Sequence, residues 1–159
     1  MSHPQIKFGT DGWRGVIADD FTFANVRTAA AAIAAYIHAQ EDPAKGLCIG
    51  YDTRFGSRAF AGACAEVVAA TGIRVALAND ITPTPALSFG VRGRGAAGGI
   101  MITSSHNPAE WNGPLGTDAD FSDNANWVIE WNNFTNNNNY IAAYRVGSNR
   151  SPFSNVIHP

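Results

Sequence analysis

Residues 98–113 read GGIMITSSHNPAEWNG, and this stretch decides the fold that we expect for the chain. Its apolar run at 99–102, flanked by small residues, is typical of a buried strand. The run breaks into a polar turn at Thr103, after which Asn107 and Pro108 suit the N-cap and the first position of a helix. Hydroxyls at a strand end, beside the free N–H groups of a helix N-terminus, favour a phosphate site. The same residues also fit an ordinary strand–turn–helix corner.

Strand-like and helix-like segments alternate on the N-terminal side of this stretch. Short apolar runs predict strands, and apolar residues at steps of three and four predict helices. The expected elements are strands at 6–8, 47–51, 75–77 and 99–102, a helix capped by Thr22 that runs to about 40, a helix at 58–70 capped by Ser57, and a helix at 86–91. This alternation predicts an α/β fold, a three-layer α/β/α domain with a mixed, largely parallel sheet.

Composition and charge narrow the possible functions. The 159 residues are 45% hydrophobic and 15% charged, with a formal net charge of −2. Because no Lys/Arg cluster is present, we expect neither nucleic acid nor an anionic membrane as a partner. No apolar run approaches the roughly 20 residues of a membrane span, and the N-terminus does not resemble a signal peptide. The expected compartment is the cytoplasm, where Cys48 and Cys64 are predicted to be buried thiols rather than a disulfide or metal site.

The hexamer Thr-Ser-Ser-His-Asn-Pro at 103–108, followed by Asn112-Gly113, is the most specific motif. It resembles the phosphoserine loop of the α-D-phosphohexomutases, the phosphoglucomutase/phosphomannomutase family, which is usually written T-A-S-H-N-P and then N-G. Ser104 in place of alanine is the one departure in the hexamer. The resemblance implies that Ser105 carries the transferable phosphate. Whether Ser104 competes for phosphate stays open.

The neighbours of Ser105 receive roles from the same resemblance. Thr103, Ser104 and Asn107 are expected to bind substrate or phosphate. His106 either positions a hydroxyl and shuttles a proton, or it is an imidazole that only caps the loop.

Two further segments resemble signatures of the family. Residues 8–15, FGTDGWRG, match the N-terminal signature F-G-T-x-G-x-R-G without a mismatch, which implies that Arg14 reaches the active site. A guanidinium grips phosphate oxygens with two parallel hydrogen bonds. Without the resemblance, the glycines and Asp11-Gly12 would indicate only a surface turn. Residues 50–57, GYDTRFGS, resemble G-x-D-x-R-x-S-S, and there Arg54 beside Asp52 is typical of a structural ion pair.

The resemblance stops after Gly113. We therefore expect a phosphohexomutase domain I at 1–113 and a divergent, Asn-rich tail at 114–159. The family continues from N-G to a lysine that this chain lacks. Strand-like residues at 127–131 and 140–146 are compatible with a divergent hairpin, a foreign tail or a frameshift product. The acids at 118, 120 and 123 are expected to form a solvated loop rather than a metal site.

The resemblance implies a function for the complete enzyme, namely the interconversion of hexose 1-phosphate and hexose 6-phosphate through a hexose bisphosphate. Mg²⁺ is expected to bridge the phosphate on Ser105 and aspartates of a domain absent here. The implied partners are hexose phosphates, hexose bisphosphate and the remaining mutase domains. We expect this chain alone to be inactive, because it supplies the phosphate carrier without the other groups.

Two other classes of function stay open. Ser105 with His106 as its base would make a serine hydrolase, although no G-x-S-x-G elbow is present. A non-catalytic fragment that binds anions or a partner chain is the other alternative. The residues do not indicate which hexose is used.

Overall fold

A five-stranded sheet organises the chain in the computed structural model, which describes residues 6–8, 12–118 and 155–157. The strand order is β6-β4-β2-β3-β7. The central strand β2 runs parallel to both β3 and β4, whereas the edge strands β6 and β7 are antiparallel to their neighbours. The bounds are β2 Leu47–Tyr51, β3 Val75–Leu77, β4 Gly98–Ile102, β6 Pro114–Asp118 and β7 Asn155–Ile157.

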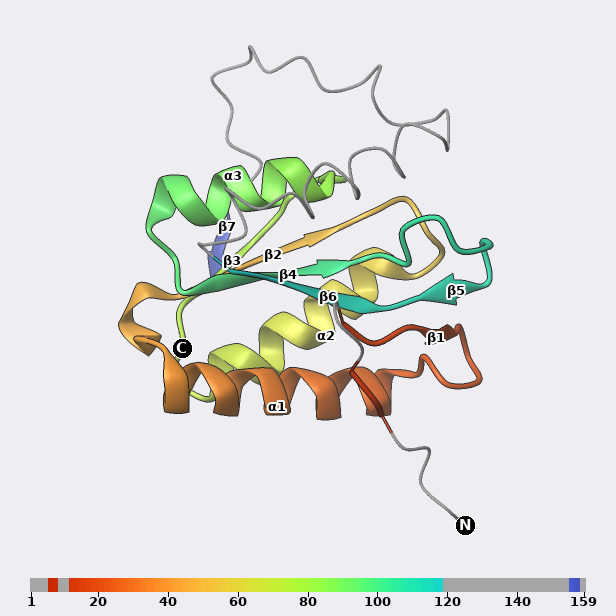
Figure 1. The fold of residues 1–159 in the computed structure, drawn as a ribbon, viewed down its shortest axis with the longest axis horizontal. Coiled ribbons are helices and arrows are strands. Elements are labelled where there is room, and N and C mark those ends of the chain that lie inside the picture. The colour runs from red at the N-terminus through yellow and green to blue at the C-terminus, as the bar shows by residue number, and fades with distance from the viewer. Residues whose placement is uncertain (1–5, 9–11, 119–154, 158–159) are drawn as a thin grey trace.

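Helices cover both faces of this sheet, as Figure 1 shows. The helices α1 and α2 lie on one face and α3 lies on the other. Their bounds are α1 Phe23–Gln40, α2 Ser57–Ala70 and α3 Thr84–Arg94, with a short 3₁₀ helix at Pro43–Lys45. The structure thus confirms the predicted three-layer α/β/α domain with a mixed sheet whose centre is parallel.

The two central strands read as continuous apolar runs because both of their faces are covered. Every residue of β2 and of β4 is buried. Cys48 on β2 and Cys64 on α2 are free and buried, as predicted. Burial raises the pKa of Cys48 to about 11 and that of Cys64 to about 12, so both thiols stay protonated near neutral pH.

The first helix begins where the sequence predicts. The Thr22 side chain accepts a hydrogen bond from the Asn25 N–H at 3.3 Å, which makes it the N-cap. Phe23, the first residue of α1, is 47% exposed and does not belong to the buried core. Its ring instead contacts Phe60 of α2 with a centroid separation of 4.5 Å.

Three local predictions were wrong. Residues 6–8 form no strand; instead β1, Gly15–Val16, pairs antiparallel with β5, Trp111–Asn112. The helix α2 begins at Ser57, after Gly56 in a left-handed conformation with φ 73°, so Ser57 is not its N-cap. No helix follows Pro108, because residues 105–106 and 109–110 form turns and residue 107 lies in a bend.

The predicted boundary at residue 113 and the Asn-rich tail remain predictions. The sheet continues past Gly113, because β6 pairs with β4 over its whole length. Residues 119–154, which include the predicted strand-like stretches and most of the acidic loop, lie outside the described residues. Among the described residues, no helix has the length and apolar character of a membrane span.

Candidate functional site

The residues 103–113, which we call the Ser105 loop, connect the carboxyl end of β4 to β6. Ser105 is half-buried and its φ of 53° lies in the left-handed region, which is uncommon for a residue other than glycine. Its Oγ lies 3.4 Å from Nδ1 of the exposed His106. The two side chains expected to act on phosphate thus stand together at the sheet end where α/β proteins place their ligands.

Asp52 joins this loop to the neighbouring strand. It follows β2 directly and is buried. Its Oδ1 accepts hydrogen bonds from the Ser57 Oγ at 2.8 Å and the Arg54 N–H at 2.9 Å. Its Oδ2 accepts a bond from the Thr103 Oγ at 2.6 Å, and that hydroxyl accepts the Ser105 N–H at 3.1 Å. A buried carboxylate therefore holds the Ser105 backbone through one threonine.

Asn112 closes the loop from its other end. Its side-chain amide, which is fully buried, donates to the Ser57 Oγ at 2.8 Å and accepts the Gly113 N–H at 2.9 Å. The Gly113 carbonyl accepts the Thr103 N–H at 2.8 Å. Ser57 is therefore shared between Asp52 and Asn112, which explains why its hydroxyl does not cap α2.

The backbone around Arg14 lies against this closing segment. Gly15 pairs with Asn112 across the β1–β5 ladder, and the Trp13 N–H donates to the Pro114 carbonyl at 3.3 Å. A side chain at Gly113 would clash with the Trp13 carbonyl oxygen, so the close approach requires glycine there. The structure brings these two signature segments together at one end of the sheet (Figure 1). Residues 9–11 of the N-terminal signature lie outside the described residues.

The two serines of the loop differ in exposure. Ser104 is fully buried, and within the described part of the chain its Oγ has no hydrogen-bond partner. Its carbonyl accepts the N–H of the half-buried Asn107 at 2.9 Å. Ser105 retains exposed surface and Ser104 has none, so only Ser105 is accessible to a phosphate donor in solution.

Arg54 forms the predicted ion pair, with its Nε 3.2 Å from the Asp52 Oδ2. Both side chains are almost fully buried. The sequence did not indicate a second feature, which is that the guanidinium also reaches across to the Ser105 loop. The close spacing of an acid, an arginine and a serine in GYDTRFGS is the one signal that could have suggested a shared network.

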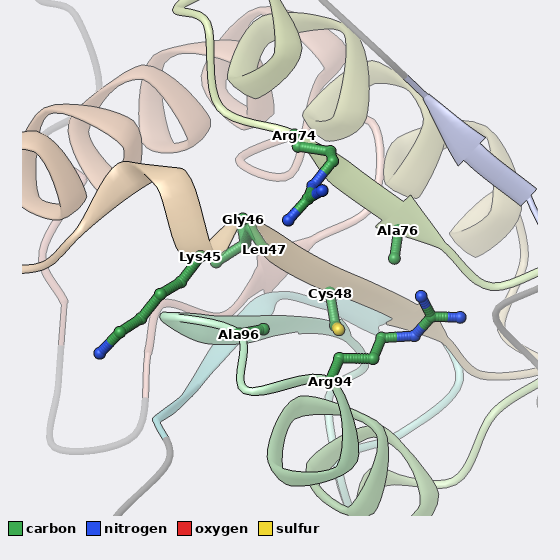
Figure 2. Close-up of a pocket in the computed structure, with 8 residues that line it drawn as sticks. All are labelled: Lys45, Gly46, Leu47, Cys48, Arg74, Ala76, Arg94 and Ala96. Atoms are coloured by element: carbon green, nitrogen blue, oxygen red, sulfur yellow. The ribbon is translucent and has the colours of Figure 1, made fainter.

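A basic pocket lies at the other end of the strands, around residues that precede or begin β2, β3 and β4 (Figure 2). Its volume is about 280 Å³, and Lys45, Arg74 and Arg94 line it. Figure 2 shows the Lys45 ammonium and the Arg94 guanidinium extending away on different sides, so the three charged groups do not converge. This pocket is separate from the Ser105 loop, which leaves the opposite end of β4.

The described residues include no group of three His, Cys, Asp or Glu side chains that could hold a metal ion. Asp118 ends β6, and the other acids of the predicted acidic loop lie beyond the described residues.

This geometry defines a class of protein, namely an α/β/α domain in which a polar loop follows a central parallel strand. A family model described as phosphoglucomutase/phosphomannomutase, alpha/beta/alpha domain I, matches residues 5–121. The chain therefore belongs to the phosphoglucomutase/phosphomannomutase family, and it contains domain I of that family.

Several relatives are similar over the same part of the chain. A phosphoglucomutase of Staphylococcus saprophyticus is 40% identical over 114 residues, which is 68% of this chain and 20% of the relative. A protein of Schizosaccharomyces pombe named probable phosphoribomutase is 39% identical over 118 residues, covering 71% of this chain and 20% of that protein.

A solved structure gives the same result. A Thermus thermophilus protein that carries the name phosphomannomutase is 45% identical, with a TM-score of 0.69. The match covers 75% of this chain and 26% of that structure. The chain thus spans about a fifth of the length of the curated relatives that it matches.

Proposed function

We propose that this chain is the phosphoserine-bearing domain of a mutase that interconverts hexose 1-phosphate and hexose 6-phosphate through a hexose bisphosphate. The observation that carries the proposal is the placement of Ser105. Its hydroxyl is accessible at the carboxyl end of β4, on a loop whose backbone is held from both sides. Family membership and the names of the relatives support the class of reaction.

The proposed step transfers a phosphoryl group between Ser105 and a sugar hydroxyl. The bond between phosphorus and the Ser105 Oγ breaks, the sugar oxygen bonds to phosphorus, and the hydroxyl proton ends on the Ser105 Oγ. We propose that His106, whose Nδ1 lies 3.4 Å from that Oγ, carries this proton. After the bisphosphate turns around, the reverse step returns the other phosphate to Ser105.

Arg14, Thr103 and Asn107 are proposed to support the transferring group. A guanidinium at residue 14 would hold phosphate oxygens from the segment paired with β5. Thr103 acts through the Ser105 N–H that its hydroxyl accepts. We propose no phosphate contact for Ser104, because its buried hydroxyl has no exposed surface.

Magnesium would be held through the phosphate on Ser105 together with acids from outside the described residues. A divalent ion neutralises charge on a phosphoryl group in transfer. The described residues include no cluster of three His, Cys, Asp or Glu side chains for this ion. The other mutase domains are the proposed source of those acids and of the sugar-recognising groups.

The test is phosphorylation of the purified chain by glucose 1,6-bisphosphate with Mg²⁺, followed by phosphopeptide mapping. We expect phosphate on Ser105 in the wild type and in Ser104→Ala, and none in Ser105→Ala. Phosphate on Ser104 alone would contradict the assignment. Phosphate on neither serine, even with the remaining mutase domains of a relative added, would favour the anion- or partner-binding alternative.

A coupled assay for glucose 6-phosphate tests the need for further domains. We expect no useful turnover by this chain, because the loss of a single placed donor costs about 10²- to 10³-fold in rate and several are supplied elsewhere. Robust turnover that Ser105→Ala abolishes would show that the 159 residues are sufficient.

A further inference from the structure

The Arg54 side chain occupies the centre of the Ser105 loop. Its Nη1 donates to the carbonyls of Pro108 at 2.7 Å and Trp111 at 3.0 Å. Its Nη2 donates to the carbonyls of Ser105 and Asn107, each at 2.8 Å. We call these four oxygens the loop carbonyls.

The remaining donor faces the sheet. The Arg54 Nε pairs with the Asp52 Oδ2 at 3.2 Å, and the arginine side chain is only 11% exposed. A guanidinium has five N–H donors in a fixed planar fork, and here each has an acceptor. Lysine has three donors on one rotating ammonium, so it cannot span four carbonyls and a carboxylate together.

This binding mode accounts for the shape of the loop. Asn107-Pro108 is a good helix start by sequence, yet the loop carbonyls turn inward to one cation instead of continuing along a helix axis. Described peptide bonds include no cis bond, so the N–H that follows an inward carbonyl points the opposite way, except after Asn107, where Pro108 has no N–H. The His106 N–H, which follows the Ser105 carbonyl, is thereby turned away from Arg54.

Arg54 and Asp52 together restrain Ser105 at both of its peptide groups. Thr103, which is bonded to Asp52, accepts the Ser105 N–H, and Arg54 binds the Ser105 carbonyl. Between these two restraints Ser105 is kept at φ 53°. This conformation costs free energy and persists only where the surrounding structure imposes it. The direction of the Ser105 Cα–Cβ bond, and so the position of its Oγ, depends on this backbone.

We propose that Arg54 is a positioning residue for phosphoryl transfer, which sets the Ser105 hydroxyl by binding the loop carbonyls. The expected effect on the phosphorylation rate rests on the proposed function, whereas the restraint of the loop by Arg54 does not depend on it. A misplacement of about 1 Å in a reacting group lowers a rate by about 10²-fold. Arg54 therefore affects the rate without touching the phosphate.

The experiment compares Arg54→Lys with Arg27→Lys, a matched control at an exposed ion pair with Glu66. Amide hydrogen exchange measures the restraint independently of any reaction. We expect the amides of residues 104–112 to exchange about tenfold faster or more in Arg54→Lys, with α1 and α2 unchanged. Arg27→Lys is expected to leave the loop at wild-type exchange rates.

The same variants are then phosphorylated with increasing concentrations of glucose 1,6-bisphosphate. We expect the maximal rate of Ser105 phosphorylation to fall about 10²-fold in Arg54→Lys, with the half-saturating concentration little changed. Arg54→Ala with added ethylguanidinium should recover part of the rate. Such recovery would not follow from a general loss of stability.

Three results separate the ideas. The proposal would be overturned if both the loop amide exchange rates and the Ser105 phosphorylation rate of Arg54→Lys lay within twofold of those of Arg27→Lys. It would also be overturned if the loop amides exchanged faster in Arg54→Lys while the phosphorylation rate stayed unchanged. Wild-type protein that never accepts phosphate, even with the remaining mutase domains of a relative added, would overturn the proposed function alone.

If Arg54→Lys does not fold, the wild type still decides whether the restraint exists. Its Arg54 Nη protons should exchange far more slowly than those of Arg27, and equal rates would overturn the restraint.

Discussion

Two arginine–carboxylate pairs in this domain have nearly the same length and different surroundings. Arg27 on α1 and Glu66 on α2 are 3.0 Å apart, with side chains 47% and 69% exposed. Arg54 and Asp52 are 3.2 Å apart, with side chains 11% and 10% exposed. The first pair joins two helix surfaces by one bond. The second lies beneath the Ser105 loop and forms hydrogen bonds to both ends of it.

The comparison shows that the separation of two charges does not set their contribution. An exposed pair exchanges water for a partner and gains little. A buried pair matters because of what remains when one partner is removed. The other charge, and the polar groups bonded to the pair, are then left buried without water or a partner.

The largest effect is expected for Asp52→Ala. The substitution leaves the Arg54 charge buried and removes the acceptor of the Thr103 and Ser57 hydroxyls. We expect the free energy of unfolding to fall by about 3–5 kcal/mol. Urea denaturation followed by circular dichroism measures this. A loss below about 1 kcal/mol would mean that the network is solvated and behaves like a surface pair.

A smaller loss is expected for Ser57→Ala, which removes one member of the network and no charge. The Asn112 side-chain amide then loses its acceptor in a fully buried position. The expected cost is about 1–3 kcal/mol. Ser88→Ala on α3 is the matched control, since that hydroxyl is also buried but has no partner among the described residues. An equal loss in both variants would contradict the role of Ser57.

The parts of the fold that sequence predicted well have local causes. The strands β2 and β3 are apolar runs between polar or glycine-containing segments, and their predicted bounds are those of the structure. The start of α1 follows from Thr22, whose cap bond spans three residues. Such signals lie within one element, so a single sequence is enough to find them.

The parts that were missed depend on partners distant in sequence. The helix expected after Pro108 does not form, and the Pro108 carbonyl instead accepts a hydrogen bond from Arg54, 54 residues away. The two-residue strands β1 and β5 have no periodicity to detect, and only their pairing defines them. Ser105 was predicted through a resemblance and stays a prediction, whereas Asn112 was not predicted to join the network because its bond to Ser57 spans 55 residues.

Ser104→Ala should change stability in the opposite direction. The buried hydroxyl has no partner among the described residues, so removing it relieves a desolvation cost. We expect a gain of about 1 kcal/mol in the free energy of unfolding. Phosphate acceptance by Ser105 should persist at the wild-type rate. Denaturant titration and phosphopeptide mapping of the same sample check both. A loss of stability would mean that Ser104 has a hydrogen bond outside the described residues.

The smallest effect is expected at the exposed pair, and a double-mutant cycle measures it. Arg27→Ala, Glu66→Ala and the double variant should give a coupling energy of about 0.2–1 kcal/mol at low salt. Because both side chains are largely exposed, 1 M NaCl, where the screening length is about 3 Å, should reduce that coupling nearly to zero. The loss in Asp52→Ala should change far less with salt, since buried charges are screened less than exposed ones. If both effects disappeared together at high salt, burial would not be what distinguishes the two pairs, and the restraint on the Ser105 loop would have to come from the backbone bonds at Thr103 and Asn112.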